Sequence, residues 1–206
     1  MDVNPFFEND IFIFDLDNTL YNENDFLIRT YRKFAYNLRM NVACDSAMLF
    51  DWLCIRYQLK NRKDIFQELI EMFNISLDQN QLLDIYRASF TTDRLHTYNF
   101  VPQLFEKLLS NGKTIMILTN GYPPQQRIKI TSLGLDISDI HIIYANEIAP
   151  KPSPILAEYL MTQIPTHSNG VVFIGDSEID EQFAKRANLK FFNVLELPLI
   201  LCKNLF

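Results

Sequence analysis

The 206-residue sequence has little cysteine, little histidine and no excess of positive charge. Its three cysteines, Cys44, Cys54 and Cys202, contain no closely spaced pair of the kind found in zinc or redox motifs. Their odd number, and an N-terminal run Met-Asp-Val-Asn-Pro without a basic region before an apolar stretch, predict a reducing, cytoplasmic location. The three histidines form no ligand cluster by spacing.

Long apolar runs are also missing, and this predicts a protein without a membrane-spanning segment, which needs about 18 or more apolar residues in a row. A net charge of -6 argues against a nucleic-acid-binding scaffold, which needs a basic stripe. Hydrophobic residues make up 48% of the chain and charged residues 21%, which is typical of a soluble globular protein. The remaining partner class is a small polar ligand, since local positive charge can bind an anion inside an acidic protein.

The most informative stretch present is an apolar run at residues 11–14 that leads directly into Asp15 and Asp17. A short Ile and Phe run without a polar face is typical of a strand buried on both sides, as in parallel sheets. Ligands of such sheets bind at the carboxyl ends of the strands, which is where this pair of acids lies. Taken alone, the two residues are equally compatible with a simple turn.

The region after this strand has helical periodicity throughout. We expect four helices within residues 21–96: one capped by Asp25, one started by Asp45, one across residues 65–73, and one after a capping box of Ser76 and Gln79. Four consecutive helices favour a separate small bundle. The chain length agrees with one core domain that carries such an insert.

Helices and strands alternate from Pro102 onward. The expected order is a helix with Pro102 in its first turn that runs through residue 109, strand 114–118, a helix from about 124 to 133, strand 142–144, helix 154–163, strand 171–174, a last helix ending near 187, and strand 191–194. This alternation predicts a parallel sheet with right-handed crossovers, and therefore an α/β fold.

Polar residues of a matching kind follow three of the expected strands, and a lysine precedes a helix. They are Asp15 and Asp17, Thr119 and Asn120, Asp176 and Asp180, and Lys151 within residues 149–154. Each has an ordinary alternative as a turn residue, a solvated charge or a helix cap. If the strands are parallel, however, all of them meet at one edge of the sheet, which predicts a site.

In order and context these motifs resemble those of the haloacid dehalogenase-like (HAD) hydrolase superfamily, over roughly residues 8–20 and 97–195. The resemblance implies a three-layer, Rossmann-like core with a parallel sheet, formed by residues 1–20 and 97–206. It also implies a small all-helical cap at 21–96, inserted between the first and second core strands.

The resemblance further implies the roles of the acids. Asp15 would be the nucleophile and Asp17 the general acid and base. Magnesium would be bound by Asp15, Asp17 and Asp176, while Asp180 would be a second acidic contributor, as a direct or water-mediated ligand or as a partner of Lys151. Thr119, Asn120 and Lys151 would hold the phosphate.

These roles are chemically consistent. A carboxylate that attacks a phosphate dianion meets repulsion of about 4 kcal/mol at about 4 Å when the effective dielectric constant is about 20, so positive charge must intervene. Mg²⁺ prefers about six oxygen ligands, and a lysine supplies a compact charge. Attack would give an aspartyl-phosphate, and the second acid would protonate the leaving group and then activate water.

The sequence therefore predicts a Mg²⁺-dependent hydrolase of a small phosphomonoester, with a lean towards nucleoside monophosphates or sugar phosphates. A 2-haloacid dehalogenase is one alternative, although it needs neither a leaving-group acid nor magnesium. A phospho-accepting signalling domain and a catalytically silent binding member of the fold are others. Intact acids and an intact lysine argue against the last.

The helical insert has the position of the lid in this superfamily, where closure would exclude water and select the substrate. Candidates to meet the leaving group are Tyr21, Phe26, Arg29 and Arg32. The arginines are more typical of the solvated side of a helix.

Overall fold

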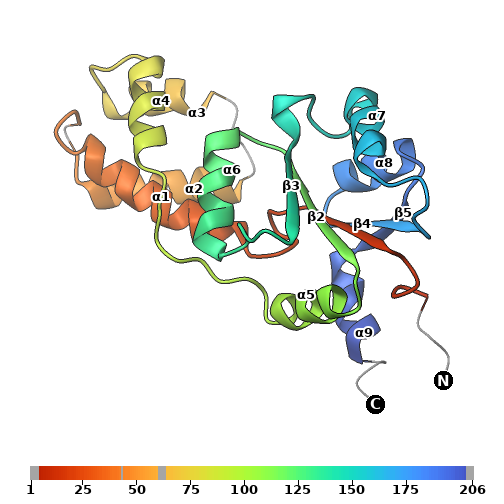
Figure 1. Cartoon of the computed structure of the whole chain (residues 1–206). Helices are drawn as coiled ribbons and strands as arrows, with labels where there is room; N and C mark the ends of the chain where they lie inside the picture. The colour runs from red at the N-terminus through yellow and green to blue at the C-terminus, as the bar shows by residue number, and fades with distance from the viewer. Residues whose placement is uncertain (1–4, 43, 60–63, 203–206) are drawn as a thin grey trace. The chain divides into compact units, whose positions relative to one another are not determined.

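The computed structural model describes residues 5–42, 44–59 and 64–202 (Figure 1). The chain divides into two compact units. One is formed by Glu23–Asp93, and the other by the segments before and after it. Among the described residues, no helix combines the length and apolar character that crossing a bilayer requires.

The larger unit contains a five-stranded parallel sheet with the strand order β3-β2-β1-β4-β5. Its strands are β1 (Ile11–Phe14), β2 (Thr114–Thr119), β3 (Ile140–Tyr144), β4 (Val171–Gly175) and β5 (Lys190–Asn193). All four residues of β1 are buried, because this strand is central and both of its faces are covered. The predicted α/β fold with a parallel sheet is confirmed.

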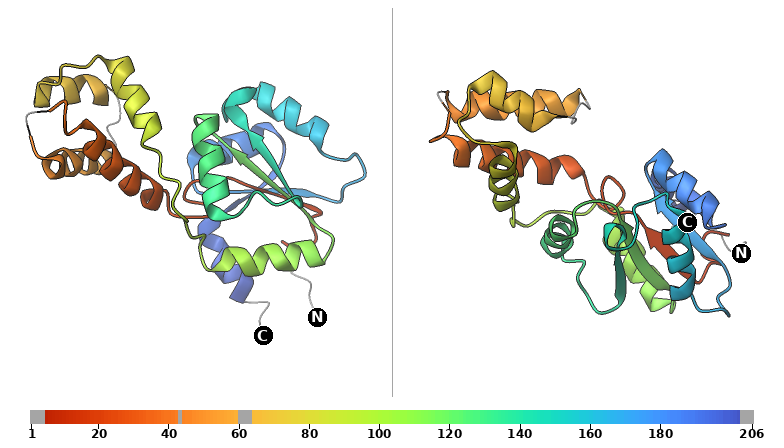
Figure 2. Two further views of the ribbon diagram at one scale, coloured as in Figure 1. Left: turned by 60° about the vertical axis from the view of Figure 1, so that its left-hand side comes forward. Right: turned by 90° about the horizontal axis from the view of Figure 1, so that it is seen from above.

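Helices pack on both faces of this sheet (Figures 1 and 2). They are α5 (Phe100–Ser110), α6 (Pro123–Leu133), α7 (Pro154–Gln163), α8 (Glu178–Arg186) and α9 (Leu197–Cys202). On one face, Phe173 of β4 meets Phe183 of α8 with ring centroids 5.5 Å apart. On the other, Phe14 of β1 lies 5.1 Å from Phe105 of α5. The alternating side chains of the strands thus supply two apolar layers.

The smaller unit contains α1 (Glu23–Leu38), α2 (Ser46–Gln58), α3 (Ile65–Phe73) and α4 (Gln79–Ala88). Its interior is largely aromatic, with Tyr86 in edge-on contact with both Phe34 and Phe90. Such contacts add to the free energy of burying each ring. The four helices expected in this region are present.

Several predicted element ends are wrong. The first helix begins at Glu23, so Asp25 lies inside its first turn and does not cap it. The capping box of α4 is formed by Asp78 and Gln81, not by Ser76 and Gln79, because the Asp78 carboxylate accepts hydrogen bonds from the backbone N–H groups of the first turn. An acid at this position satisfies donors that would otherwise lack partners.

The core helices and strands show similar shifts. The start of α5 is an exception, because the helix begins at Phe100 and Pro102 lies in its first turn as predicted, where the missing N–H of proline costs nothing. The third strand begins at Ile140 and α6 begins at Pro123. A further helix, α9, follows β5, so the helix that ends at Arg186 is not the last.

Phe183 tests the packing between α8 and the sheet. Phe183→Ala is expected to lower the free energy of unfolding by about 3–5 kcal/mol, because it removes a fully buried ring that packs on Phe173. Urea denaturation of wild type and variant would measure this. Lys185→Ala, at an exposed position of the same helix, should change stability by less than about 0.5 kcal/mol. Equal effects of the two changes would contradict the assigned packing.

Candidate active site

The loop after β1 places two carboxylates beyond the central strand. The Asp15 N–H donates to the carbonyl oxygen of Ile174 at 2.9 Å, so the pairing of β1 with β4 extends one residue past the strand. The chain then turns, with Asn18 at a φ of 58° and the Leu20 N–H donating to the Leu16 carbonyl at 3.0 Å. Asparagine tolerates this left-handed conformation better than most residues.

A pocket of about 210 Å³ lies at the carboxyl ends of β1, β2 and β4. It is lined by Asp15, Asp17, Asn18, Thr119, Asn120, Lys151, Asp176, Ser177, Ile179 and Asp180. All seven core residues that the sequence analysis singled out are therefore brought together. The parallel register explains this, because residues that follow adjacent parallel strands emerge on the same edge of the sheet.

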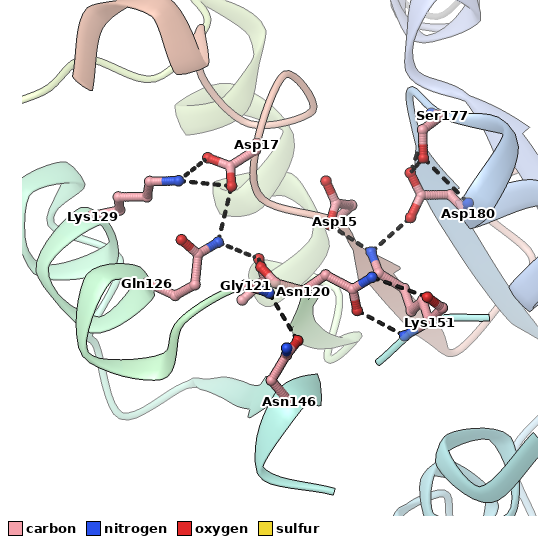
Figure 3. A network of polar contacts seen from close by, with 11 residues as sticks. Asp15, Asp17, Asn120, Gly121, Gln126, Lys129, Asn146, Lys151, Ser177 and Asp180 are labelled. Carbon is pink, nitrogen blue, oxygen red and sulfur yellow. Dashed lines mark hydrogen bonds and ion pairs between the residues drawn. The ribbon is translucent and has the colours of Figure 1, made fainter. Parts of the chain in front are cut away.

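Lys151 lies between two of these carboxylates (Figure 3). Its Nζ is 2.6 Å from Oδ1 of Asp15 and 2.6 Å from Oδ1 of Asp180. Burial disfavours the charged amine, but the two carboxylates outweigh this effect and raise the pKa of Lys151 above its usual value. The side chain is therefore a buried ammonium group that is held by two ion pairs.

Asp180 is fixed from several sides. Its Oδ2 accepts a hydrogen bond from the Ser177 hydroxyl at 2.5 Å, as part of a capping box at the start of α8. Gly175 leaves room for it, because a Cβ at that position would lie 2.6 Å from Asp180 Cβ. The sequence analysis left two roles open for Asp180, a direct or water-mediated metal ligand and a partner of Lys151. The contact with Lys151 is observed.

The Asn120 side chain connects the end of β2 to the lysine loop. Its Oδ1 accepts from the Lys151 N–H at 2.7 Å and its Nδ2 donates to the Lys151 carbonyl oxygen at 3.1 Å. The next residue, Gly121, donates its N–H to Oδ1 of Asn146 at 2.9 Å. The Asn120 amide therefore positions the backbone that carries Lys151.

The electrostatics of Asp15 and Asp176 differ from those of ordinary surface carboxylates. Burial raises the pKa of Asp15 to about 7, with Asp180 and Asp17 adding to the shift and Lys151 opposing it. Burial and the charge of Asp180 also raise the pKa of Asp176. Both groups thus lie where negative charge is poorly compensated.

Asp17 has the opposite character. Nζ of Lys129 is 2.8 Å from each of its carboxylate oxygens, and the Gln126 amide and the Tyr21 hydroxyl also donate to it. Burial alone would raise the pKa of Asp17, but Lys129 and these hydrogen bonds hold it below its usual range. The Asp17 side chain is a well-supported carboxylate.

Gln126 and Lys129 were not predicted as site residues. Both lie on the buried side of α6, where their exposed fractions are 1% and 2%. The sequence does hold a signal, because Gln126, Lys129, Ile130 and Leu133 follow helical spacing, so that two polar residues occupy an apolar stripe. A buried lysine nearly always has a charged partner, which here is Asp17.

The four residues that were predicted to contact the leaving group of the substrate are placed as follows. Tyr21 is buried and bonds to Asp17 at 2.6 Å. Phe26 is fully buried and packs against Phe90, so its predicted role as a substrate contact is corrected to one in the interior of the helical unit. Arg29 is half-buried, whereas Arg32 is exposed with its guanidinium 5.1 Å from the Phe50 ring.

Three carboxylates are suitably placed for a cation. Asp15, Asp176 and Asp180 each offer an oxygen, and these oxygens lie within 4.8 Å of one another. Together with Asp17, four carboxylates face two buried ammonium groups, Lys151 and Lys129, which leaves an excess of two negative charges when all are ionised. Oxygen ligands with this charge excess fit a divalent cation such as Mg²⁺.

Comparison with known proteins agrees with this geometry. A family model described as haloacid dehalogenase-like hydrolase matches residues 12–194. A search of curated proteins finds no match.

Solved structures show the same fold at low sequence identity. One is a Bacillus subtilis protein, YfnB, described as a HAD-hydrolase bound to magnesium, with a TM-score of 0.63, 19% identity, and coverage of 89% of this chain and 87% of that one. Another, from Thermotoga maritima and assigned as a β-phosphoglucomutase, has a TM-score of 0.66, 16% identity, and coverage of 94% and 99%. L-2-haloacid dehalogenase from Xanthobacter autotrophicus has a TM-score of 0.55, 19% identity, and coverage of 89% and 76%.

The family match spans most of the chain, from β1 to the residue after β5, and includes every strand-end motif that lines the pocket. The resemblance noted from the sequence is confirmed, and the chain belongs to the haloacid dehalogenase-like hydrolases.

Proposed function

We propose that this protein is a Mg²⁺-dependent phosphomonoester hydrolase that acts on a small phosphorylated metabolite through an aspartyl-phosphate on Asp15. The observation that carries the proposal is the Asp15–Lys151 contact of 2.6 Å in a pocket that Asp17 and Asp176 also line. In this proposal, residues 1–20 and 97–206 form the catalytic core and 21–96 the cap.

Asp15 is the proposed nucleophile. Lys151 donates a hydrogen bond to Oδ1 of Asp15. Among the described residues, no donor contacts Oδ2 of Asp15, and this oxygen can attack phosphorus. The phosphoryl group carries charge of the same sign, and the Lys151 ammonium reduces the resulting repulsion. Attack forms the Asp15 O–P bond as the bond to the leaving oxygen breaks.

The phosphoryl oxygens would be held by donors at the end of β2. We assign this role to the Thr119 hydroxyl and to Lys151, with any contact of Asn120 made by its backbone N–H, because its amide is bonded to the lysine loop. The pocket has a volume of about 210 Å³. It suits a phosphoryl group and part of a leaving group.

Mg²⁺ would be held by Asp15 and Asp176, with Asp180 as the third carboxylate of the same group and Asp17 as a proposed further ligand outside it, and when bound it would neutralise phosphate charge. The acids keep separate roles around it. Asp17 would protonate the leaving oxygen and then accept a proton from the water that hydrolyses the aspartyl-phosphate. Its Lys129 partner favours the carboxylate, which is the form required in the second step, and disfavours the protonated form required in the first.

A dehalogenase of the same fold attacks carbon and needs neither a second acid nor a cation. The carboxylates of Asp17 and Asp176 in the pocket therefore favour phosphate chemistry over that alternative. Among phosphomonoesters, nucleoside monophosphates and sugar phosphates are our leading candidates.

Removal of the nucleophile is the first test. Asp15→Asn is expected to lower phosphate release on the order of a thousandfold or more, because the amide cannot form the covalent intermediate. The assay uses a panel of nucleoside monophosphates, sugar phosphates and 4-nitrophenyl phosphate, with Mg²⁺ and with EDTA. Asp139→Asn, an exposed acid, is the matched control and should retain activity. Equal activity of Asp15→Asn and wild type would refute the assignment.

Proton competition for the cation site is the second test. The pKa of Asp15 is about 7, so below pH 7 a proton occupies this carboxyl and must leave before a cation binds. We expect the Mg²⁺ dissociation constant from calorimetry to rise by up to about tenfold per pH unit between pH 7 and pH 5.5, with proton release on binding. Asp15→Asn should flatten this dependence, and a constant affinity in the wild type would contradict the site.

The raised pKa of Asp15 also makes the stability of the folded protein depend on pH. The pKa of Asp15 is higher in the folded protein than in the unfolded chain, so the protonated Asp15 carboxyl stabilises the cation-free protein. This stabilisation is complete below pH 3.8, the usual pKa of the group, and is lost as the pH rises through about 7. Added Mg²⁺ should therefore increase the melting temperature more at pH 8 than at pH 5.5.

Gly175 is the third test, because it leaves space for Asp180. Gly175→Ala is expected to displace the Asp180 carboxylate, weaken its hold on Lys151 and lower phosphate release by at least about tenfold. Asp180→Asn should lower it too, and the double variant should lose much less than the product of both factors. Full additivity, or an unaffected Gly175→Ala, would mean that the two residues act separately.

A further inference from the structure

The carboxylate of Asp17 is held by donors from two parts of the chain. Lys129 and Gln126 reach it from α6, at 2.8 Å and 2.9 Å, while Tyr21 reaches it from the loop after β1, at 2.6 Å (Figure 3 shows the first two). Both oxygens accept a hydrogen bond from the Lys129 ammonium. This fixes the rotamer of the side chain as well as its charge.

Stability alone is a weak reason for such an arrangement. Lys129 is 2% exposed and Gln126 is 1% exposed, so both have lost nearly all contact with water. Buried ion pairs often stabilise a fold no more than apolar residues of the same size would. A charged and an amide side chain in the apolar stripe of α6 therefore point to a role at the site that they face.

Gln126 also contacts the proposed phosphate-binding end of β2. Its Nε2 donates to Oγ1 of Thr119 at 2.7 Å and to Oδ2 of Asp17 at 2.9 Å. A single amide nitrogen thus sets the separation between a phosphate-binding hydroxyl and the carboxyl that serves the leaving group. The leaving oxygen is bonded to the same phosphorus, so this separation matters for proton transfer.

We propose that Lys129 and Gln126 are positioning residues, which act through Asp17 by holding its carboxyl within reach of the leaving-group oxygen. The proposal rests on the function proposed above. In the first step, Asp15 bonds to phosphorus as the P–O bond to the leaving group breaks, and the leaving oxygen takes the proton of Asp17 in its protonated form. In the second step, the Asp17 carboxylate takes a proton from a water molecule. The oxygen of that water molecule bonds to phosphorus as the bond between Asp15 and phosphorus breaks. Both steps fail if the carboxyl is misplaced.

The leaving group distinguishes positioning from general support of the fold. An alkoxide leaves poorly without a proton, whereas 4-nitrophenolate leaves readily without one. Variants that misplace Asp17 should therefore slow formation of the phosphoenzyme from an alkyl phosphate much more than from 4-nitrophenyl phosphate. A variant that merely loosens the pocket should slow both equally.

The experiment measures first-turnover release of the leaving group by rapid quench, with Mg²⁺, for 4-nitrophenyl phosphate and for the best alkyl phosphate of the panel. Lys129→Met is expected to slow the alkyl reaction by about ten- to a hundredfold and the nitrophenyl reaction by less than about threefold. Gln126→Leu should show the same selectivity with a smaller loss. Lys185→Met, an exposed lysine on α8, is the matched control and should match wild type.

Two further variants separate positioning from folding. Lys129→Arg keeps the charge and should recover at least half of the lost alkyl rate. In an Asp17→Asn background, Lys129→Met should change the alkyl rate by less than about twofold, because the residue through which Lys129 acts is already disabled. This double variant removes both charges of the buried ion pair, so no unpaired charge is left in the interior. We therefore expect it to fold even if Lys129→Met alone does not, which keeps the comparison possible.

The result that would overturn the inference is a loss of equal size for both leaving groups, no loss for either, or an undiminished effect of Lys129→Met in the Asp17→Asn background. Failure of the proposed function would look different. In that case wild type releases no phosphate from any substrate, or Asp15→Asn is as active as wild type.

Discussion

The buried ammonium of Lys151 is the interaction on which the rest of the site depends. It joins the carboxylates that follow β1 and begin α8, two segments that are far apart in the sequence. Without it, Asp15 and Asp180 would place like charges together in a setting of low dielectric constant, and the repulsion would be large. The Asn120 amide fixes the backbone of Lys151 to the end of β2, so one cation ties three ends of secondary structure together.

Much of this could be predicted from the sequence. The buried run at residues 11–14 and its two acids indicated a strand of a parallel sheet, because the strands of such sheets are covered by helices on both faces. The convergence of Thr119 and Asp176 followed from the direction of parallel strands, and Lys151 was expected with them because its loop precedes a helix of the same series. Both inferences rest on patterns within a few residues, which the fold preserves.

The missed features depend on contacts between distant segments. Local spacing showed Lys129 as one polar residue of a helix, and only the packing of α6 beside the loop after β1 makes it the partner of Asp17. The predicted contact role of Phe26 failed for the same reason, since position next to a motif does not reveal which side chains a helix buries. Helix ends such as the Asp78 cap were misplaced because several nearby polar residues compete for the same backbone donors.

The central position of β1 has a consequence for local motion. This strand is hydrogen-bonded along its length to β2 on one side and to β4 on the other, whereas β3 and β5 form the borders of the sheet. Local opening begins where fewest neighbours must separate, so the borders exchange their amide hydrogens with solvent first. We therefore expect the amides from Ile13 to Asp15 to exchange only with global unfolding, and the backbone of the proposed nucleophile to be among the last parts of the molecule to lose its order.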